Sequence, residues 1–280
     1  MGNDASRTQR RLSLALIGQL VRKDLKVKYQ GSSLGFFWSL ANPLLQLIIY
    51  SVVFAVFMRS SVPAFGFFLM SGLLVWNFFS MSVTGSSISI LANAGLVKKV
   101  PFPHASLPLA AIGFAAIQVL LQLGVFILVL VVAGRAPLRP ELLLLVPATI
   151  VLLVLTVGLG LFVAATTVRY RDTQHLLEVS MFAWMWLTPI IYPPSFVHDQ
   201  LGATYTWLYY LNPMAGIVVN FQRALYGLAY DSGTGKLLSG GDSTGFYLQV
   251  LGIGLVVSAL IFVAGWRQFR RLSQDFAEDL

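Results

Sequence analysis

The sequence predicts an all-α integral membrane protein with six transmembrane helices, an N-terminal amphipathic interface helix and short re-entrant outer helices between spans five and six. Hydrophobic residues make up 57% of the 280 residues, charged residues only 11%, and the mean hydropathy is +0.77. Water-soluble domains do not have this composition. The net charge of +8 comes from basic residues beside apolar segments, so it indicates membrane topology and not nucleic-acid binding.

Residues 1–12 are polar and are expected to be disordered, and an interface helix is expected over about 13–30. Apolar residues recur there at steps of three and four, and basic residues fall on the opposite arc, which is typical of a helix lying along a membrane surface. Lys28 breaks the apolar arc and is expected to pair with Asp24. No cleavable signal precedes this helix, so the first span should direct insertion. The apolar positions are Leu14, Ile17, Val21, Leu25 and Tyr29, and the basic ones include Arg22, Lys23 and Lys26.

Six apolar segments reach or approach the length of about 20 residues that a membrane span needs. They cover about 34–57, 64–83, 105–132, 142–167, 176–192 and 246–266. Pro43 should kink the first span, and the prolines at 189–194 should end the fifth. Residues 13–271 thus form a single transmembrane domain, followed by a cytoplasmic tail at 272–280.

Two connections differ from ordinary loops. Residues 86–95 should form a short helix after the second span, which Lys98, Lys99 and the prolines at 101 and 103 bring to an end. Residues 195–246 are too apolar for a solvated loop, yet they contain Asn212-Pro213. Counting them as a full span would put the last three arginines outside, so we expect two short helices that enter the outer leaflet and return.

The basic residues fix the expected orientation, with both termini cytoplasmic. Of the 19 Lys and Arg residues, five lie outside in this topology, which leaves 14 on the cytoplasmic side. This excess on one side is the usual signature of cytoplasmic loops. The five outside residues are Arg59, Arg135, Arg139, Arg223 and Lys236.

The chain does not carry the chemistry of an energy source. The segment 233–236, GTGK, lacks both the upstream glycine and the following hydroxyl of a phosphate-binding loop. No cysteine is present, and His104, His175 and His198 lack metal-ligand spacing, so no metal site is expected. Glu178 lies at a span end and does not form an intramembrane proton relay. The driving energy should therefore come from a partner.

Several motifs in a fixed order resemble an ABC-2-type transporter permease, specifically the branch that exports O-antigen, teichoic acid and capsular polysaccharides. The resemblance extends from about residue 14 to 271. The motifs are RKDLKVKY at 22–29, SLG at 33–35 with Trp38 and Pro43, NAGLVKK at 93–99, FP at 102–103, YRD at 170–172, PIIYP at 189–193, and LNP at 211–213 before Arg223.

The resemblance implies a homodimer of permeases in the bacterial inner membrane, coupled to two cytoplasmic ABC ATPase subunits. The chain would then be a transport subunit without cofactors, and ATP and magnesium would bind to its partner. His104 departs from the family, which often has Arg or Lys there. A basic pair such as Lys98-Lys99 also satisfies topology without contacting a partner, and this alternative stays open. The expected ATPase-coupling residues are Arg22, Lys23, Lys26, Ser87, Asn93, Lys98, Lys99 and Phe102.

The expected substrate is a lipid-linked glycan, moved past aromatic faces that stack on sugars without fixing one register. Residues four apart share a helix face, which separates a Trp38, Asn42 and Gln46 stripe from a Phe37, Ala41 and Leu45 stripe suited to lipid or packing. Two alternatives remain: an exporter of a drug or small lipid, and a membrane glycosyltransferase or passive channel. The expected channel residues are Trp38, Asn42, Gln46, Trp184 and Tyr192, and the expected outer gate is Tyr209, Tyr210, Asn212, Pro213 and Arg223.

Overall fold

The computed structural model describes residues 2–31, 37–58, 61–100, 102–239, 241 and 243–280, and all regular elements within these ranges are helical. Arg59, Pro101 and the SLG motif at 33–35 lie outside the described residues. The α-helices are α1 Gly2–Tyr29, α2 Phe37–Val52, α3 Phe65–Ser89, α4 Ala94–Lys99, α5 Ser106–Val132, α6 Leu145–Arg169, α7 Thr173–Trp186, α8 Pro194–Tyr209, α9 Pro213–Leu225, α10 Thr244–Leu272 and α11 Phe276–Asp279. The shorter helical elements are a π-helix, η1 Val53–Phe57, and two 3-10 helices, η2 Leu91–Asn93 and η3 Pro140–Leu144.

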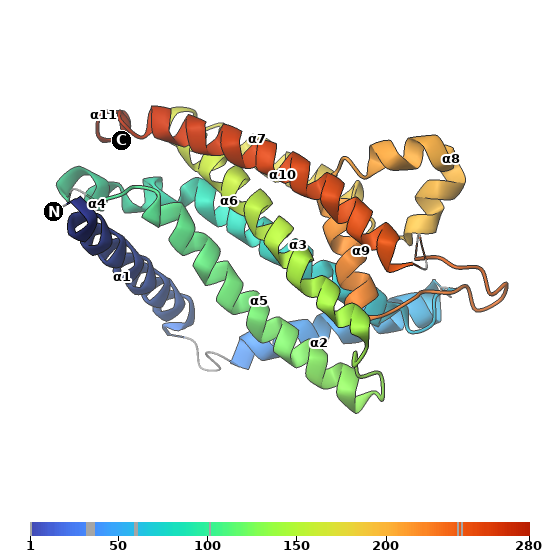
Figure 1. Cartoon of the computed structure of the whole chain (residues 1–280). Coiled ribbons are helices and arrows are strands. Elements are labelled where there is room, and N and C mark those ends of the chain that lie inside the picture. Colours follow the sequence, from blue (N-terminus) through green and yellow to red (C-terminus); the bar gives the residue numbers. More distant parts are fainter. Residues whose placement is uncertain (1, 32–36, 59–60, 101, 240, 242) are drawn as a thin grey trace.

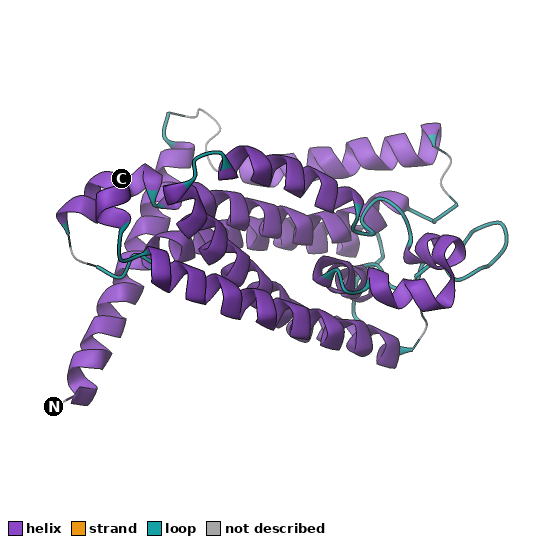
Figure 2. Ribbon diagram, turned by 90° about the horizontal axis from the view of Figure 1, so that it is seen from above, coloured by secondary structure: helices purple, strands orange, loops and turns teal. Residues whose placement is uncertain are grey.

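Among the described residues, four helices are long and apolar enough to cross a membrane: α3, α5, α10, and α6 together with η3. They run alongside one another as a bundle (Figures 1 and 2), in which α3 packs on α5 and α6, and α6 packs on α10. The tightest approach joins α6 to α10, where a Cβ added to Gly158 or Gly265 would collide with the backbone of the facing helix. Small residues at such crossings let membrane helices pack closely.

The other two expected spans, α2 with η1 and α7, are not among these four helices. The apolar part of α2 and η1 covers Ala41–Phe57, and α2 continues through Pro43. Helix α7 has 14 residues and ends at Trp186, before the expected end at 192. At 1.5 Å per residue it is about 21 Å long, against about 30 Å of hydrocarbon.

Two further helix boundaries differ from those expected. Helix α3 continues to Ser89, so residues 86–95 do not form one separate helix but comprise the end of α3, the turn η2 and the start of α4. Ser87 and Ser89 donate hydroxyl hydrogen bonds to the carbonyls of Thr84 and Ser86, which satisfies these hydroxyls inside the helix. Helix α1 begins at Gly2, earlier than the expected start at about 13.

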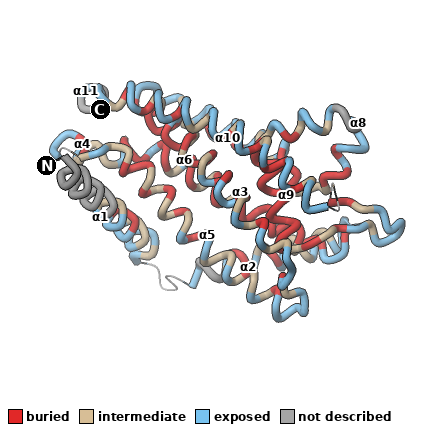
Figure 3. The backbone as a smooth tube through the Cα atoms, viewed as in Figure 1, coloured by how far each residue is buried: buried red, intermediate tan, exposed pale blue. Residues whose placement is uncertain are grey.

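The two ends of the bundle carry different elements, and Figure 3 shows how buried residues concentrate along its interior. Helices α4 and α11 and both chain termini lie at one end, which we call the α4 end, whereas α8 lies at the opposite end, the α8 end (Figure 1). Between α7 and α10, the chain breaks after α8 and restarts as α9 at Pro213, as the Asn212-Pro213 pair predicted. Every residue of α9 is buried, and it packs on α3, α6 and α10.

Candidate coupling surface and substrate path

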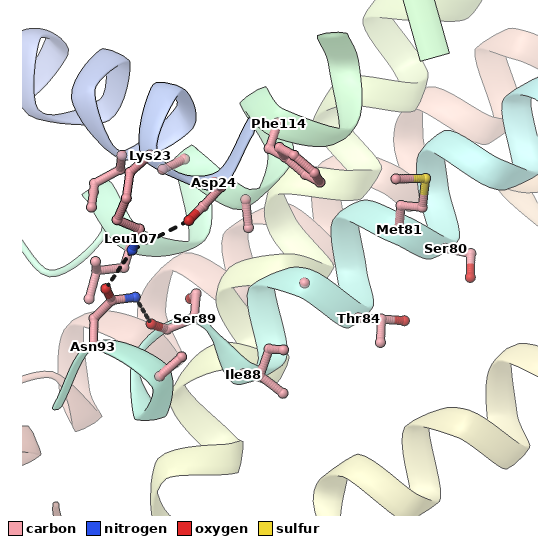
Figure 4. A pocket seen from close by; sticks show the side chains of 15 residues that line it. Lys23, Asp24, Ser80, Met81, Thr84, Ile88, Ser89, Asn93, Leu107 and Phe114 are labelled. Carbon is pink, nitrogen blue, oxygen red and sulfur yellow. Dashed lines mark hydrogen bonds and ion pairs between the residues drawn. The ribbon is translucent and has the colours of Figure 1, made fainter. Parts of the chain in front are cut away.

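A basic surface lies at the α4 end, formed by α1 and α4. Arg22 and Lys26 are exposed on α1, and Lys98 and Lys99 are exposed on the last turn of α4. A hydrogen bond joins the two parts of this surface (Figure 4): Lys23 Nζ donates to Asn93 Oδ1 at 3.1 Å. The structure therefore brings together two predicted coupling residues that are seventy positions apart in the sequence.

Two predicted roles on this surface do not match the structure. Ser87 is buried in α3 and donates to Thr84 O at 2.7 Å, so its side chain does not reach the surface. Lys28 does not pair with Asp24, whose Oδ1 instead lies 3.3 Å from Lys23 Nζ. The partner of Lys28 lies on the neighbouring helix α5, which the helical period of α1 does not reveal.

Lys28 instead fastens the end of α1 to the middle of α5. Its Nζ donates to Gln118 Oε1 at 2.8 Å and lies 5.5 Å from the centre of the Phe114 ring. Gln118 is 1% exposed, and its Nε2 donates to the Tyr29 hydroxyl at 2.9 Å. A charged donor to a buried amide makes a strong hydrogen bond. These residues form a polar latch, Lys28–Gln118–Tyr29, between α1 and α5.

The loop after α4 rests on the C-terminal tail. The Phe102 ring meets the His104 ring edge-on with 5.4 Å between their centres, and His104 lies 5.8 Å from the ring of Phe276. Phe276 is 1% exposed and also packs edge-on against Phe269 of α10. Phe276 was not among the predicted functional residues, although a single aromatic residue in the charged tail was an available signal. The tail therefore supports the segment that carries Phe102.

Four of the predicted path and gate residues, Trp184, Tyr192, Tyr209 and Asn212, meet in one polar cluster at the α8 end. Trp184 Nε1 donates to Asn212 Oδ1 at 2.8 Å, and Asn212 Nδ2 donates to Leu187 O at 3.2 Å. The Tyr192 hydroxyl lies 3.1 Å from the Tyr209 hydroxyl and donates to Trp186 O at 3.0 Å. Beside them is a hollow of about 470 Å³. Its lining residues are Trp184, Leu187, Leu208, Tyr209, Leu211, Asn212 and Pro213.

Asn212 also explains why the chain breaks at this point. Its Oδ1 accepts from Met214 N at 3.1 Å and so caps α9, while Pro213 at the first helical position needs no hydrogen-bond partner for its nitrogen. One side chain thus starts α9 and holds the indole of α7.

Two predicted gate residues lie in packed structure and do not line this hollow. Tyr210 is buried beside Phe246 and Tyr247. Arg223 is 8% exposed, and its Nη2 donates to Glu141 Oε1 at 2.6 Å. This ion pair joins α9 to η3. Removing either partner would be destabilising, because it would leave the other charge largely withdrawn from water. A structural role follows for both residues.

The predicted stripe on α2 faces outward from the chain. Trp38 is 45% exposed and Asn42 is exposed, while Gln46 is half-buried. Phe37 is 58% exposed and Leu45 is also exposed, so burial does not separate the two stripes. None of Trp38, Asn42 and Gln46 lines the hollow beside Trp184.

The segment 231–236 folds around an aspartate. Asp231 Oδ1 accepts from the backbone nitrogens of Gly233 and Thr234 at 2.9 and 2.7 Å, and Lys236 Nζ pairs with Asp199 at 2.6 Å. Hydrogen bonds from Ser61 and Thr234 lower the pKa of Asp231 to about 2. Acceptance of backbone N–H groups by a carboxylate is typical of a tight turn.

Four spanning-length apolar helices, with a polar cluster at one end and a basic surface at the other, define a multi-pass helical membrane protein. Residues 15–226 match the family model described as ABC-2 type transporter, and the chain belongs to this family.

Named relatives share most of the length. The chain is 33% identical over 211 residues to an O-antigen export system permease protein RfbA of Myxococcus xanthus, covering 75% of this chain and 80% of that protein. An RfbA of Klebsiella pneumoniae is 28% identical over 265 residues, 95% of both proteins. The polysialic acid transport protein KpsM of Escherichia coli is 24% identical over 204 residues, 71% of this chain and 76% of that protein.

Proposed function

We propose that this chain is the transmembrane subunit of an ATP-driven exporter that moves a lipid-linked polysaccharide, such as O-antigen or a similar glycopolymer, from the cytoplasm across the inner membrane. The observation that carries the proposal is the similarity to a permease named for O-antigen export over 95% of both chains. The chain itself is a transport subunit, and ATP hydrolysis with its magnesium takes place in a separate partner.

The proposed assembly is a homodimer of permeases with two ABC ATPase subunits at the α4 end. Exposed basic residues at this end, with both chain termini beside them, support a cytoplasmic location. In this topology α2 with η1 and α7 act as the first and fifth of six spans, and α8 and α9 are the re-entrant outer helices. Exposed apolar side chains on α2 and α7 support a dimer contact there, including Ile48, Ile49, Val52, Val179, Phe182 and Trp186.

The proposed substrate path runs from the stripe Trp38, Asn42 and Gln46 to the hollow beside Trp184. A repetitive glycan must slide, and each hydrogen-bonded group that it leaves behind in a buried site costs about 1–3 kcal/mol. Stacking on indole and phenol faces is more tolerant of position. The hydrogen bond from Trp184 to Asn212 fixes an indole at the edge of this hollow without requiring a fixed sugar register.

Depletion of the chain in its own cell tests the function. We expect lipid-linked glycan to accumulate inside the cell, and affinity purification of the permease to recover an ABC ATPase in equal amounts. Accumulation of a small lipid or retention of a drug instead would establish the alternative ABC-2 exporter. Normal surface glycan after depletion would contradict the proposal.

A further inference from the structure

A cavity of about 540 Å³ lies between α1, α3 and α5 at the α4 end (Figure 4). Its charged and amide side chains, Lys23, Asp24 and Asn93, lie together in one part of the lining, and Ser80, Thr84 and Ser89 add hydroxyls. The rest is largely apolar and includes Leu20, Met81, Ile88, Leu107, Ala110 and Phe114. A ligand that fits this cavity must combine a charged head with a hydrocarbon part.

The charges in the polar part have opposite signs and lie side by side. Lys23 Nζ is 3.3 Å from Asp24 Oδ1 and donates to Asn93 Oδ1. An ammonium has three N–H donors and a carboxylate has two oxygens, so a donor and an oxygen remain after these contacts. Both side chains also remain accessible, at 49% and 39%. The cavity therefore offers a cation and an anion together.

We propose that this cavity binds a zwitterionic membrane phospholipid with a primary ammonium group. Its phosphate would contact Lys23 and its ammonium Asp24, while an acyl chain would lie against Met81 and Phe114. An anionic lipid without an amine would gain the contact to Lys23 but would meet repulsion from Asp24. Charge complementarity thus selects the zwitterionic headgroup.

The position of the cavity agrees with this ligand. It lies where α3 ends and α5 begins, beside the amphipathic helix α1, so polar and apolar surfaces change over at the level where headgroups are found. The proposal rests on the proposed function only in assigning this end to the cytoplasmic leaflet. Lipid binding itself requires no transport.

Retention of lipid by the purified permease tests the proposal. The protein is reconstituted in bilayers of equal phosphatidylethanolamine and phosphatidylglycerol, extracted in detergent and weighed by native mass spectrometry. We expect one phosphatidylethanolamine per chain, and a roughly two- to fivefold loss of its preference over phosphatidylglycerol in Asp24→Asn, as for an exposed ion pair. Equal retention of the two lipids, or none, would overturn the proposal.

Two variants block the cavity from different sides. A Cβ added to Gly85 would meet only Ala111 Cβ, at an ordinary 3.5 Å, so Gly85→Leu extends a side chain into the lining. Ala92→Trp covers the exposed rim. The matched control is Gly124→Leu on α5, where an added Cβ meets nothing within 4 Å and which lies outside the cavity lining.

We expect loss of the bound lipid in both blocking variants and full retention in the control. Retention in both blocking variants would refute the cavity as the site. Because the measurement weighs bound lipid, it is independent of glycan export: a chain that binds lipid but exports no glycan would contradict only the proposed function.

Discussion

The polar latch between α1 and α5 gives the most direct test of how the interface helix is held. In Lys28→Met the apolar stem remains, but the 2.8 Å hydrogen bond to Gln118 is lost. Gln118 keeps Tyr29 as a partner, since the hydroxyl lies 3.2 Å from Oε1, so the change does not leave the buried amide unpaired. A hydrogen bond to a charged group contributes about 1.5–3 kcal/mol. Because Lys28 is exposed, we take the lower value of about 1.5 kcal/mol for this hydrogen bond. Its loss corresponds to roughly a tenfold rise in the fraction of molecules in which α1 is detached from α5.

Thiol labelling measures this population because the chain has no cysteine. Val21 lies on the face of α1 that packs toward Gly113 of α5, and it is 7% exposed. A cysteine in its place therefore reacts with a water-soluble maleimide only when α1 detaches from α5. We expect labelling in reconstituted protein to be about ten times faster in Lys28→Met.

The control is Lys26→Met on the same helix, since Lys26 is exposed and has no hydrogen bond or ion pair with any residue that the structure describes. A second cysteine at the fully buried Ala115 monitors the rest of the bundle. Equal labelling rates at Val21 in the two lysine variants would refute the latch. Faster labelling at Ala115 as well would show global unfolding instead.

Three further predictions concern coupling and the substrate path. Charge reversal of Lys98 and Lys99 should abolish export and permease-stimulated ATPase activity while membrane insertion is kept; loss of the protein from the membrane would favour a topology role alone. Deletion of the tail from Phe276 onward removes a side chain that is 1% exposed. We expect the free energy that holds the loop carrying Phe102 against the bundle to fall by about 3–5 kcal/mol, and export-coupled ATPase activity to fall with it. Trp38→Ala should lower export at matched expression more than Phe37→Ala, and equal effects would contradict the assigned stripe.

The sequence by itself determined the class of protein and much of its chain path. The spans predicted at 105–132 and 246–266 correspond to α5 at Ser106–Val132 and α10 at Thr244–Leu272, because a long apolar run is a local property. The break at Asn212-Pro213 was also predictable, since proline geometry and an asparagine cap act over a few residues.

Only the tertiary structure decided which polar residues are buried and what they contact. The serines at 86–89 were expected to begin a new helix, yet they continue α3, where Ser86 Oγ donates to Pro108 O of α5 at 3.3 Å and the hydroxyls of Ser87 and Ser89 donate to carbonyls of α3 itself. Lys28 has Gln118 as its partner, and Arg223 has Glu141, ninety and eighty-two positions away in the sequence. Helical periodicity describes one helix at a time, whereas burial and ion pairing depend on which helix packs against it.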